Sequence, residues 1–205
     1  MPQIRPYAPA DRTAVADICV RTADAGADAT GMFRDDLLWA DVFVLPYVDR
    51  HPGLAFVVVS DDDRVVGYVV AAPDTEDFEE WFGAQWWPAV RDRYPLEGAS
   101  DRERDIIRYA QKRAAGQQWH AREYPAHLHI DLLPELQGQG FGRRLIETLI
   151  AALERDGITG VHLEASSENA GAVAFYPRVG FDELPSGEGS RAFARRLRPT
   201  AQPRP

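Results

Sequence analysis

Residues 127–144 read His-Leu-His-Ile-Asp-Leu-Leu-Pro-Glu-Leu-Gln-Gly-Gln-Gly-Phe-Gly-Arg-Arg, and this stretch predicts a strand, a glycine-rich turn and a helix. The strand covers Ala126–Leu133 and ends at Pro134, because proline cannot donate to a sheet ladder. From Phe141 onward, apolar residues recur at the spacing of a helix with one buried stripe, namely Leu145, Ile146, Leu149, Ile150 and Leu153. After Glu154 this helix is expected to end at the C-cap Asp156-Gly157.

The turn between strand and helix contains Gly138, Gly140 and Gly142. Glycine allows a sharp turn and close approach by another molecule. The first amides of the following helix have no partner within it and lie at the positive end of its dipole. We therefore expect an anion, and a diphosphate in particular, at this turn. The glycine spacing differs from those of the P-loop and of the dinucleotide-binding fingerprint.

Two motifs stand out, of which the first is Gln137-x-x-Gly140-x-Gly142, preceded by Leu132-Leu133-Pro134. This first motif resembles the coenzyme A site of the GNAT family of N-acetyltransferases, and a second resemblance to the family lies downstream. The second is the segment 169–181, Asn-Ala-Gly-Ala-Val-Ala-Phe-Tyr-Pro-Arg-Val-Gly-Phe. The resemblance implies an α/β GNAT fold, in which a mixed, mostly antiparallel central sheet is flanked by helices.

Acetyl-CoA is the cosubstrate that this resemblance implies. Its pantetheine arm would lie along Leu132 and Leu133, and a main-chain amide near Ile130 to Leu132 would hydrogen-bond the thioester oxygen. Its diphosphate would lie on the amides of the glycine turn. The residues that would bind it are Leu132, Leu133, Gln137, Gly138, Gln139, Gly140, Phe141, Gly142, Arg143, Asn169, Ala172, Phe175 and Tyr176. Asn169 is equally suited to be a helix N-cap.

The same resemblance makes Tyr176 the acid that protonates the leaving thiolate, with a core tyrosine as the alternative. Pro177 disfavours the helical region for Tyr176 and could turn its ring away from the usual direction. The base is not assigned by any motif. His127, His129 and Asp131 form a polar face on a strand that should be interior. They are candidates for the base, and a buried hydrogen-bonded network is the alternative. We expect no metal, because the spacing of these ligands does not make a closed site.

Composition narrows the classes of protein. The 205 residues are 45% apolar, and we expect a single domain at 1–198 with a flexible tail at 199–205. A net charge of −9 disfavours nucleic acid and leaves room for a cationic acceptor. The single Cys19 excludes an internal disulfide, and neither a signal peptide nor a membrane segment is apparent. We expect a cytoplasmic protein with no nucleic-acid or membrane partner.

The rest of the chain predicts further strands at Gln3–Arg5, Leu54–Ser60, Val65–Ala72, Gly160–Ala165, Phe181–Leu184 and Ser190–Leu197. Helices are expected after Pro9, at Arg34–Tyr47 and at the end of the 169–181 motif. The helix at Arg34–Tyr47 would bury Leu37, Leu38, Val42 and Leu45. Residues 74–120 form an aromatic-rich insertion with expected helices at Glu76–Tyr94, broken near Pro88, and at Asp101–Ala115. This insertion is either a buttress over the sheet or a lid that lines the acceptor pocket.

The function that these motifs favour is transfer of an acetyl group from acetyl-CoA to the amine of a small-molecule acceptor, by direct attack in a ternary complex. The chain also resembles the acetyltransferase-like C-terminal domain of animal O-GlcNAc hydrolases, through Ala126–His129 and Ala174–Tyr176. That resemblance supports the alternative of an acetyl-CoA-binding module with a regulatory or interaction role. Acetylation of a protein tail is a third possible function, and a homodimer is a possible oligomeric state.

Overall fold

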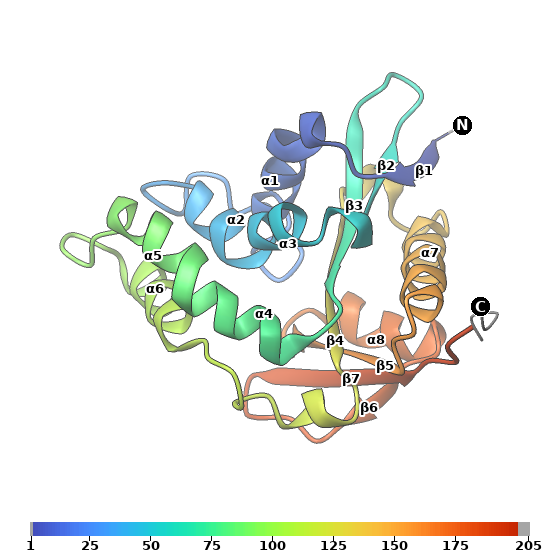
Figure 1. Cartoon of the computed structure of the whole chain (residues 1–205). Helices are drawn as coiled ribbons and strands as arrows, with labels where there is room; N and C mark the ends of the chain where they lie inside the picture. Colours follow the sequence, from blue (N-terminus) through green and yellow to red (C-terminus); the bar gives the residue numbers. More distant parts are fainter. Residues whose placement is uncertain (1, 201–205) are drawn as a thin grey trace.

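The computed structural model describes residues 2–200 and has one mixed sheet of seven strands (Figure 1). The strand order is β1-β2-β3-β4-β5-β7-β6, and neighbouring strands are antiparallel except for β4 and β5, which are parallel. The predicted α/β class with a mostly antiparallel sheet is therefore confirmed. The strands are β1 (Gln3–Pro6), β2 (Ala55–Val59), β3 (Val65–Ala72), β4 (Ala126–Leu132), β5 (Gly160–Ser166), β6 (Asp182–Leu184) and β7 (Ser190–Arg196).

Helices cover both faces of the sheet. Helix α7 packs on β2, β3 and β4 through its buried stripe, while α1 to α6 lie on the other side of these strands (Figure 1). Helix α8 lies beside α7, since the ring of Phe175 approaches Gly142. The helices are α1 (Arg12–Val20), α2 (Leu37–Phe43), α3 (Leu45–Arg50), α4 (Thr75–Trp81), α5 (Trp87–Val90), α6 (Asp101–Lys112), α7 (Phe141–Arg155) and α8 (Ala170–Arg178).

The single helix expected at Arg34–Tyr47 is two helices in the structure. Val44 leaves the helical region, with φ −139° and ψ −44°, and separates α2 from α3. Pro46 explains the position of this break, because proline disfavours the helical region for the residue before it and is well tolerated in the first turn of a helix. Leu37 was expected in the core and is 42% exposed.

The insertion is helical, as predicted, but its helices differ in detail. A helical run covers α4, a π-helical turn at Phe82–Trp86, α5 and a 3₁₀ turn at Arg91–Arg93. The π turn precedes Pro88, whose missing N–H would interrupt a regular helix. Helix α6 ends at Lys112, three residues before the predicted end, because Arg113 adopts an extended conformation with ψ 125°.

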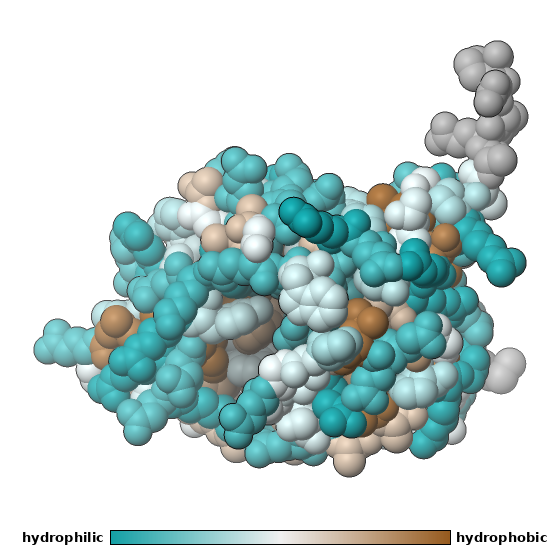
Figure 2. Space-filling model, turned by 90° about the horizontal axis from the view of Figure 1, so that it is seen from below, coloured by the Kyte–Doolittle hydropathy of each residue, from teal (hydrophilic) through white to brown (hydrophobic). Residues whose placement is uncertain are grey.

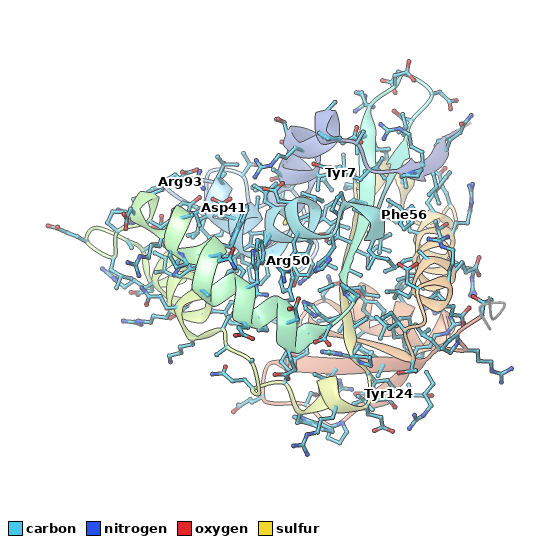
Figure 3. The ribbon with its side chains drawn as sticks, in the orientation of Figure 1. Tyr7, Asp41, Arg50, Phe56, Arg93 and Tyr124 are labelled. Carbon is cyan, nitrogen blue, oxygen red and sulfur yellow. The ribbon has the colours of Figure 1, made fainter. Side chains whose placement is uncertain are left out.

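The insertion shares the hydrophobic core. Phe78 and Phe82 are fully buried within the same cluster as the sheet residues. Asp41 on α2 is buried and accepts from Arg93 and from the Tyr94 hydroxyl, and Figure 3 shows Asp41 and Arg93 directed toward each other. The insertion is thus tied to the N-terminal helices by apolar packing and by ionic contacts.

The last described residues contact α7. The amides of Arg198 and Thr200 donate to Glu154 over 2.9 and 3.1 Å. The remainder of the predicted tail, residues 201–205, lies outside the described residues. Among residues 2–200, no helix combines the length and apolarity that crossing a bilayer requires.

Candidate active site

A gap opens between the two parallel strands at the centre of the sheet. β4 and β5 pair at Ala126 with Val161 and at His127 with His162. β4 continues for five more residues, all of which stay paired with β3 on its other side. The carboxyl half of β4 therefore has one edge that is not covered by β5.

The direction of the backbone groups on that edge follows from one hydrogen bond. The Leu133 amide donates to the Val66 carbonyl over 3.0 Å, so it points toward β3. Backbone groups alternate in direction along a strand. The backbone groups of Ile130 and Leu132 consequently point into the gap. The Leu132 carbonyl accepts from the Gln137 side chain, so the two amides and the Ile130 carbonyl are the groups with which an inserted extended chain could pair.

The glycine turn begins where β4 ends. Gly138 and Gly140 have φ values of +73° and +83°, in the left-handed region that disfavours side chains. A Cβ at either position would meet no atom within 4 Å, so the space above both is open. Gly140 is the N-cap of α7, whose first amides have no partner in the helix. The turn thus offers backbone donors and room for an anion.

Gly142 has a different role from the other two glycines. A Cβ there would lie 3.1 Å from Cζ of Phe175 and 3.4 Å from Cδ1 of Leu132. Its missing side chain lets α7 approach α8 and the end of β4. The two predicted motifs therefore meet at this residue.

The polar side chains of the first motif are engaged within the protein. Gln137 donates to the Leu132 carbonyl over 3.1 Å and Gln139 donates to the Glu135 carbonyl. Arg143 donates to the Arg178 carbonyl over 2.6 Å at the end of α8. Arg144 lies 4.7 Å from the ring centroid of Phe141. The phosphate role predicted for Arg143 would require it to leave this carbonyl.

Asn169 caps α8, since its Oδ1 accepts from the Ala172 amide over 2.9 Å. The structural alternative for Asn169 is therefore present, and a contact with pantetheine stays a prediction. Tyr176 is buried, and its ring packs against Phe181 and Phe193. Helix α8 continues through Pro177 to Arg178.

Burial raises the pKa of the Tyr176 hydroxyl well above its ordinary value, and the negative charge of Asp131 raises it further. The phenol therefore keeps its proton at neutral pH. The influence of Asp131 also shows that the predicted acid and a predicted base act on one another across this site.

Asp131 is half-buried and accepts from the hydroxyl of Tyr68, its partner on β3. Burial raises the pKa of Asp131 to about 6, and the Tyr68 hydrogen bond opposes that shift. A carboxylate that changes charge near pH 6 is suited to accept a proton at neutral pH. Tyr68 was not among the predicted site residues.

His127 and His129 belong to a hydrogen-bonded chain. The Thr75 hydroxyl lies 2.7 Å from the Pro125 carbonyl and 2.9 Å from Nδ1 of His127. The Tyr47 hydroxyl lies 2.7 Å from Nε2 of His127 and 3.1 Å from Nε2 of His129. The hydrogen-bonded network, one of the two alternatives for this polar face, is therefore present. The role of general base stays a prediction, and His129 is half-buried whereas His127 is buried.

Both imidazoles are neutral at physiological pH. Burial lowers the pKa of His127 well below its ordinary value, with His162 and His129 adding to the effect. Burial, and then the charge of Arg113, lowers the pKa of His129 to about 3. Arg113 is buried, pairs with Glu79 over 2.7 Å and donates to the Tyr47 hydroxyl over 3.5 Å.

Sequence reasoning missed Tyr47, Thr75 and Arg113 as members of this site. They come from α3, from the start of α4 and from the end of α6, and none lies in a motif. The polar face of β4 was the one sequence feature that indicated these residues, because buried polar side chains require polar partners inside the protein. The sequence could not show which residues are the partners, because Tyr47 and His127, for example, are 80 residues apart.

An aromatic wall lies beside His129. The ring of Phe43 lies between two others: it is tilted against Trp39, with centroids 4.5 Å apart, and stacked on Tyr109, with centroids 5.6 Å apart. The Phe43 and His129 ring centroids are 5.9 Å apart. Tyr109 belongs to α6 and is 46% exposed. The insertion therefore packs into the core through Phe78 and Phe82, and it contributes Tyr109 to this aromatic wall.

Glu164 on β5 lies on the same face of the sheet as this wall. His127 and His162 are register partners, so they share a face with Glu164, two residues further along β5. Glu164 is exposed and its charge acts on the Tyr109 hydroxyl. Viewed from below, the molecule has a hollow with apolar residues in its floor and a polar rim, on the side of the helical insertion (Figure 2).

Two other features of the described residues bear on the chemistry. Cys19 is fully buried in α1, and burial raises the pKa of its thiol well above the ordinary value. Within residues 2–200, no three histidine, cysteine or carboxylate side chains are grouped as candidate metal ligands.

The family model described as Acetyltransferase (GNAT) family matches residues 25–181. Among solved structures, the crystal structure of SsHAT is 41% identical in sequence with a TM-score of 0.88, covering 95% of this chain and 98% of that one. A phosphinothricin acetyltransferase of the GNAT superfamily from Sinorhizobium meliloti, solved in complex with acetyl-CoA, has a TM-score of 0.57 at 15% identity. That alignment covers 96% of this chain and 89% of that one.

Curated relatives are matched over part of their length. Protein O-GlcNAcase of Rattus norvegicus is 22% identical over 190 residues, which are 91% of this chain and 20% of that protein. The ribosomal protein bS18-alanine N-acetyltransferase of Escherichia coli is 46% identical over 55 residues, 27% of this chain and 37% of that enzyme. The chain thus spans about a fifth of the length of the O-GlcNAcase that it matches.

Proposed function

Because the chain belongs to the acetyltransferase (GNAT) family, we propose that it transfers an acetyl group from acetyl-CoA to the amine of a small-molecule acceptor. The observation that carries the proposal is the gap between β4 and β5, which has a free backbone edge on β4 and ends at the open glycine turn. An extended pantetheine arm would pair with that edge. Its diphosphate would then reach the amides of Gly138 to Gly142.

The reaction would proceed by direct attack. The amine nitrogen forms a bond to the thioester carbonyl carbon, and the carbon–sulfur bond then breaks. The N–H proton passes to the carboxylate of Asp131, directly or through a water molecule, and Tyr176 gives its phenolic proton to the leaving thiolate. The backbone amides of Ile130 and Leu132 stabilise the negative charge on the carbonyl oxygen.

An acetyl-enzyme intermediate is not part of this proposal. Cys19 is the single cysteine, and its buried thiol has a raised pKa, so little thiolate forms at neutral pH. A free buried thiol also fits a reducing compartment, and we place the reaction in the cytoplasm.

A small cationic amine fits the acceptor side best. The exposed ring of Tyr109 is the accessible end of the aromatic wall, and the carboxylates of Asp131 and Glu164 lie on the same face of the sheet. Aromatic faces and carboxylates both attract an ammonium group. The ammonium must first lose one proton to solvent before the neutral amine attacks, and the N–H proton released during the attack is the one that Asp131 accepts.

Calorimetric titration of acetyl-CoA and coenzyme A, followed by a screen of small amines for thiol release, tests the proposal. We expect micromolar binding that is lost in Gly140→Asp, because the new carboxylate would repel the diphosphate. Gly157→Asp is the matched control, since Gly157 follows the other end of α7 with a φ of +82° and open space around it.

Each outcome has a distinct meaning. Absence of acetyl-CoA binding to the parent protein would contradict the proposal. Equal loss of binding in both variants would mean that the substitutions act by destabilising α7 and not by repelling the diphosphate. Tight binding without thiol release for any amine or protein tail would favour the alternative, an acetyl-CoA-binding module.

A further inference from the structure

The hydrogen-bonded chain that contains His127 and His129 has a fixed direction. The Pro125 carbonyl can only accept, so the Thr75 hydroxyl must donate to it. The Thr75 oxygen then accepts from Nδ1–H of His127. A neutral imidazole carries one proton, so Nε2 of His127 is bare and accepts from the Tyr47 hydroxyl.

The direction of the chain fixes the tautomer of His129. The single hydroxyl proton of Tyr47 goes to His127, so Tyr47 can only accept from its other neighbours. Arg113 is a donor to the Tyr47 oxygen in any case. His129 must therefore carry its proton on Nε2, which donates to Tyr47 over 3.1 Å. Nδ1 of His129 is left with a lone pair.

That lone pair has no partner among the described residues and belongs to a half-buried side chain. His129 lies two positions beyond the last residue of β4 that pairs with β5. Its ring is held by Tyr47 and by the edge contact with Phe43. Nδ1 is thus a fixed hydrogen-bond acceptor at the mouth of the gap, next to the aromatic wall.

We propose that Tyr47 is a positioning residue that holds His129 in the Nε2–H tautomer, so that Nδ1 of His129 accepts a hydrogen bond from the acceptor amine. This inference rests on the acetyl transfer proposed above. A neutral amine that donates one N–H to Nδ1 has its nitrogen lone pair held in a defined direction. His129 itself binds the amine, while Asp131 takes the proton.

His127 cannot have the same role. Both of its nitrogens are used within the protein, by Thr75 and Tyr47, and the residue is buried. Two histidines on one face of one strand therefore have opposite tautomers. This difference is a direct and measurable consequence of the chain.

Long-range proton–nitrogen correlation NMR on the full chain tests the assignment without any substrate. We expect His129 to show protonated Nε2 and bare Nδ1, and His127 to show the reverse. A proton on Nδ1 of His129 in the parent protein would overturn the proposal.

Thr75→Val gives a sharper test, because it removes the hydroxyl that fixes the direction of the chain. Nδ1 of His127 would then lose its acceptor, and an unpaired buried N–H costs more than an unpaired lone pair. We expect both tautomers to reverse in Thr75→Val and to stay unchanged in Thr75→Ser, which keeps a hydroxyl. Parent-like tautomers in Thr75→Val would contradict the fixed direction.

Kinetics with an accepted amine test the role of the lone pair. Loss of one hydrogen bond predicts about a tenfold fall in kcat/KM for the amine in Tyr47→Phe and in Thr75→Val. Binding of acetyl-CoA should not change. Tyr94→Phe is the control, since it removes another buried tyrosine hydroxyl whose partner is Asp41, outside the chain.

The two proposals can fail separately. Reversed tautomers with unchanged kcat/KM in Thr75→Val would overturn the role of His129 toward the amine. Failure of the parent protein to acetylate any amine would overturn the proposed function and the positioning role with it. The tautomer assignment would then still be decided by the spectra alone.

Discussion

The two sides of the gap between β4 and β5 are built in different ways. The side proposed for the cosubstrate consists of backbone groups on β4 and at the glycine turn, within 13 residues from Ile130 to Gly142. The side proposed for the acceptor depends on a network of hydrogen-bonded side chains whose partners are 34 to 82 residues apart in the sequence. A backbone site tolerates change in side chains, whereas a side-chain network depends on every member.

Arg113→Met should have the largest effect, because it breaks the network on the acceptor side. The variant leaves Glu79 charged and buried without its partner, and we expect a loss of about 3–5 kcal/mol in the free energy of unfolding. Urea denaturation measures this loss. Arg12→Ala is the control, since its pair with Asp49 is largely exposed and should contribute under about 1 kcal/mol. Similar losses in the two variants would refute the distinction.

Asp131→Asn tests the proton acceptor on the same side. We expect kcat/KM for an accepted amine to fall by about 10²-fold, which is at the lower end for loss of a general base. In the parent protein, kcat/KM should decrease as the pH falls through about 6, because Asp131 must be ionised to take a proton. That decrease should disappear in Asp131→Asn. A variant that kept parent activity would remove Asp131 from the mechanism.

The pH dependence of stability should also come from the acceptor side. The folded-state pKa values of His127, His129 and His162 are lowered, the last two to about 3 and about 4. Their contribution to the free energy of unfolding is complete above pH 6.5. It is lost as the pH falls toward these pKa values, at about 1.4 kcal/mol per pH unit for each histidine. Asp131, whose pKa is raised, opposes this trend below about pH 6.

Urea denaturation at pH 5 and pH 7 measures the balance of these groups. We expect lower stability at pH 5, because three histidines outweigh one carboxyl group. His129→Gln should reduce the difference between the two pH values, and Asp131→Asn should increase it. Equal stability of the parent protein at both pH values would count against the lowered histidine pKa values.

Gly140→Ala should have the smallest effect, because it changes a site made of backbone. The left-handed conformation costs alanine about 1–2 kcal/mol, and no neighbouring atom adds a clash. Gly157→Ala has the same conformational cost at the other end of α7. We expect equal losses of stability in the two variants, with weaker acetyl-CoA binding in Gly140→Ala alone. Parent-like binding there would argue against close approach of the diphosphate.

The same contrast explains what could be predicted from the sequence. The strand, turn and helix at residues 126–155 were predicted to within one residue at each boundary, because their signals are local. The break at Val44 and the exposure of Leu37 were missed, since the spacing of apolar residues alone suggested one helix. The polar face of β4 was recognised, and its base was left open among three residues.

The partners of that face could not have been predicted. Tyr47 was expected only as the last residue of a helix, and Thr75 and Arg113 had no expected role in the site. Their positions depend on how the insertion packs against α3 and β4, which is decided by contacts distant in sequence. The predicted contacts of Gln137, Arg143 and Asn169 with acetyl-CoA stay predictions.

The narrow seam between β4 and β5 has a mechanical consequence. The seam pairs two positions, Ala126 with Val161 and His127 with His162, and it joins the four strands on one side of the sheet to the three on the other. A sheet joined over so short a length bends most easily there. An extended chain bound along Ile130 and Leu132 would stiffen the sheet at that seam. The two halves would then move as one body, and amide hydrogen exchange in β4 would slow.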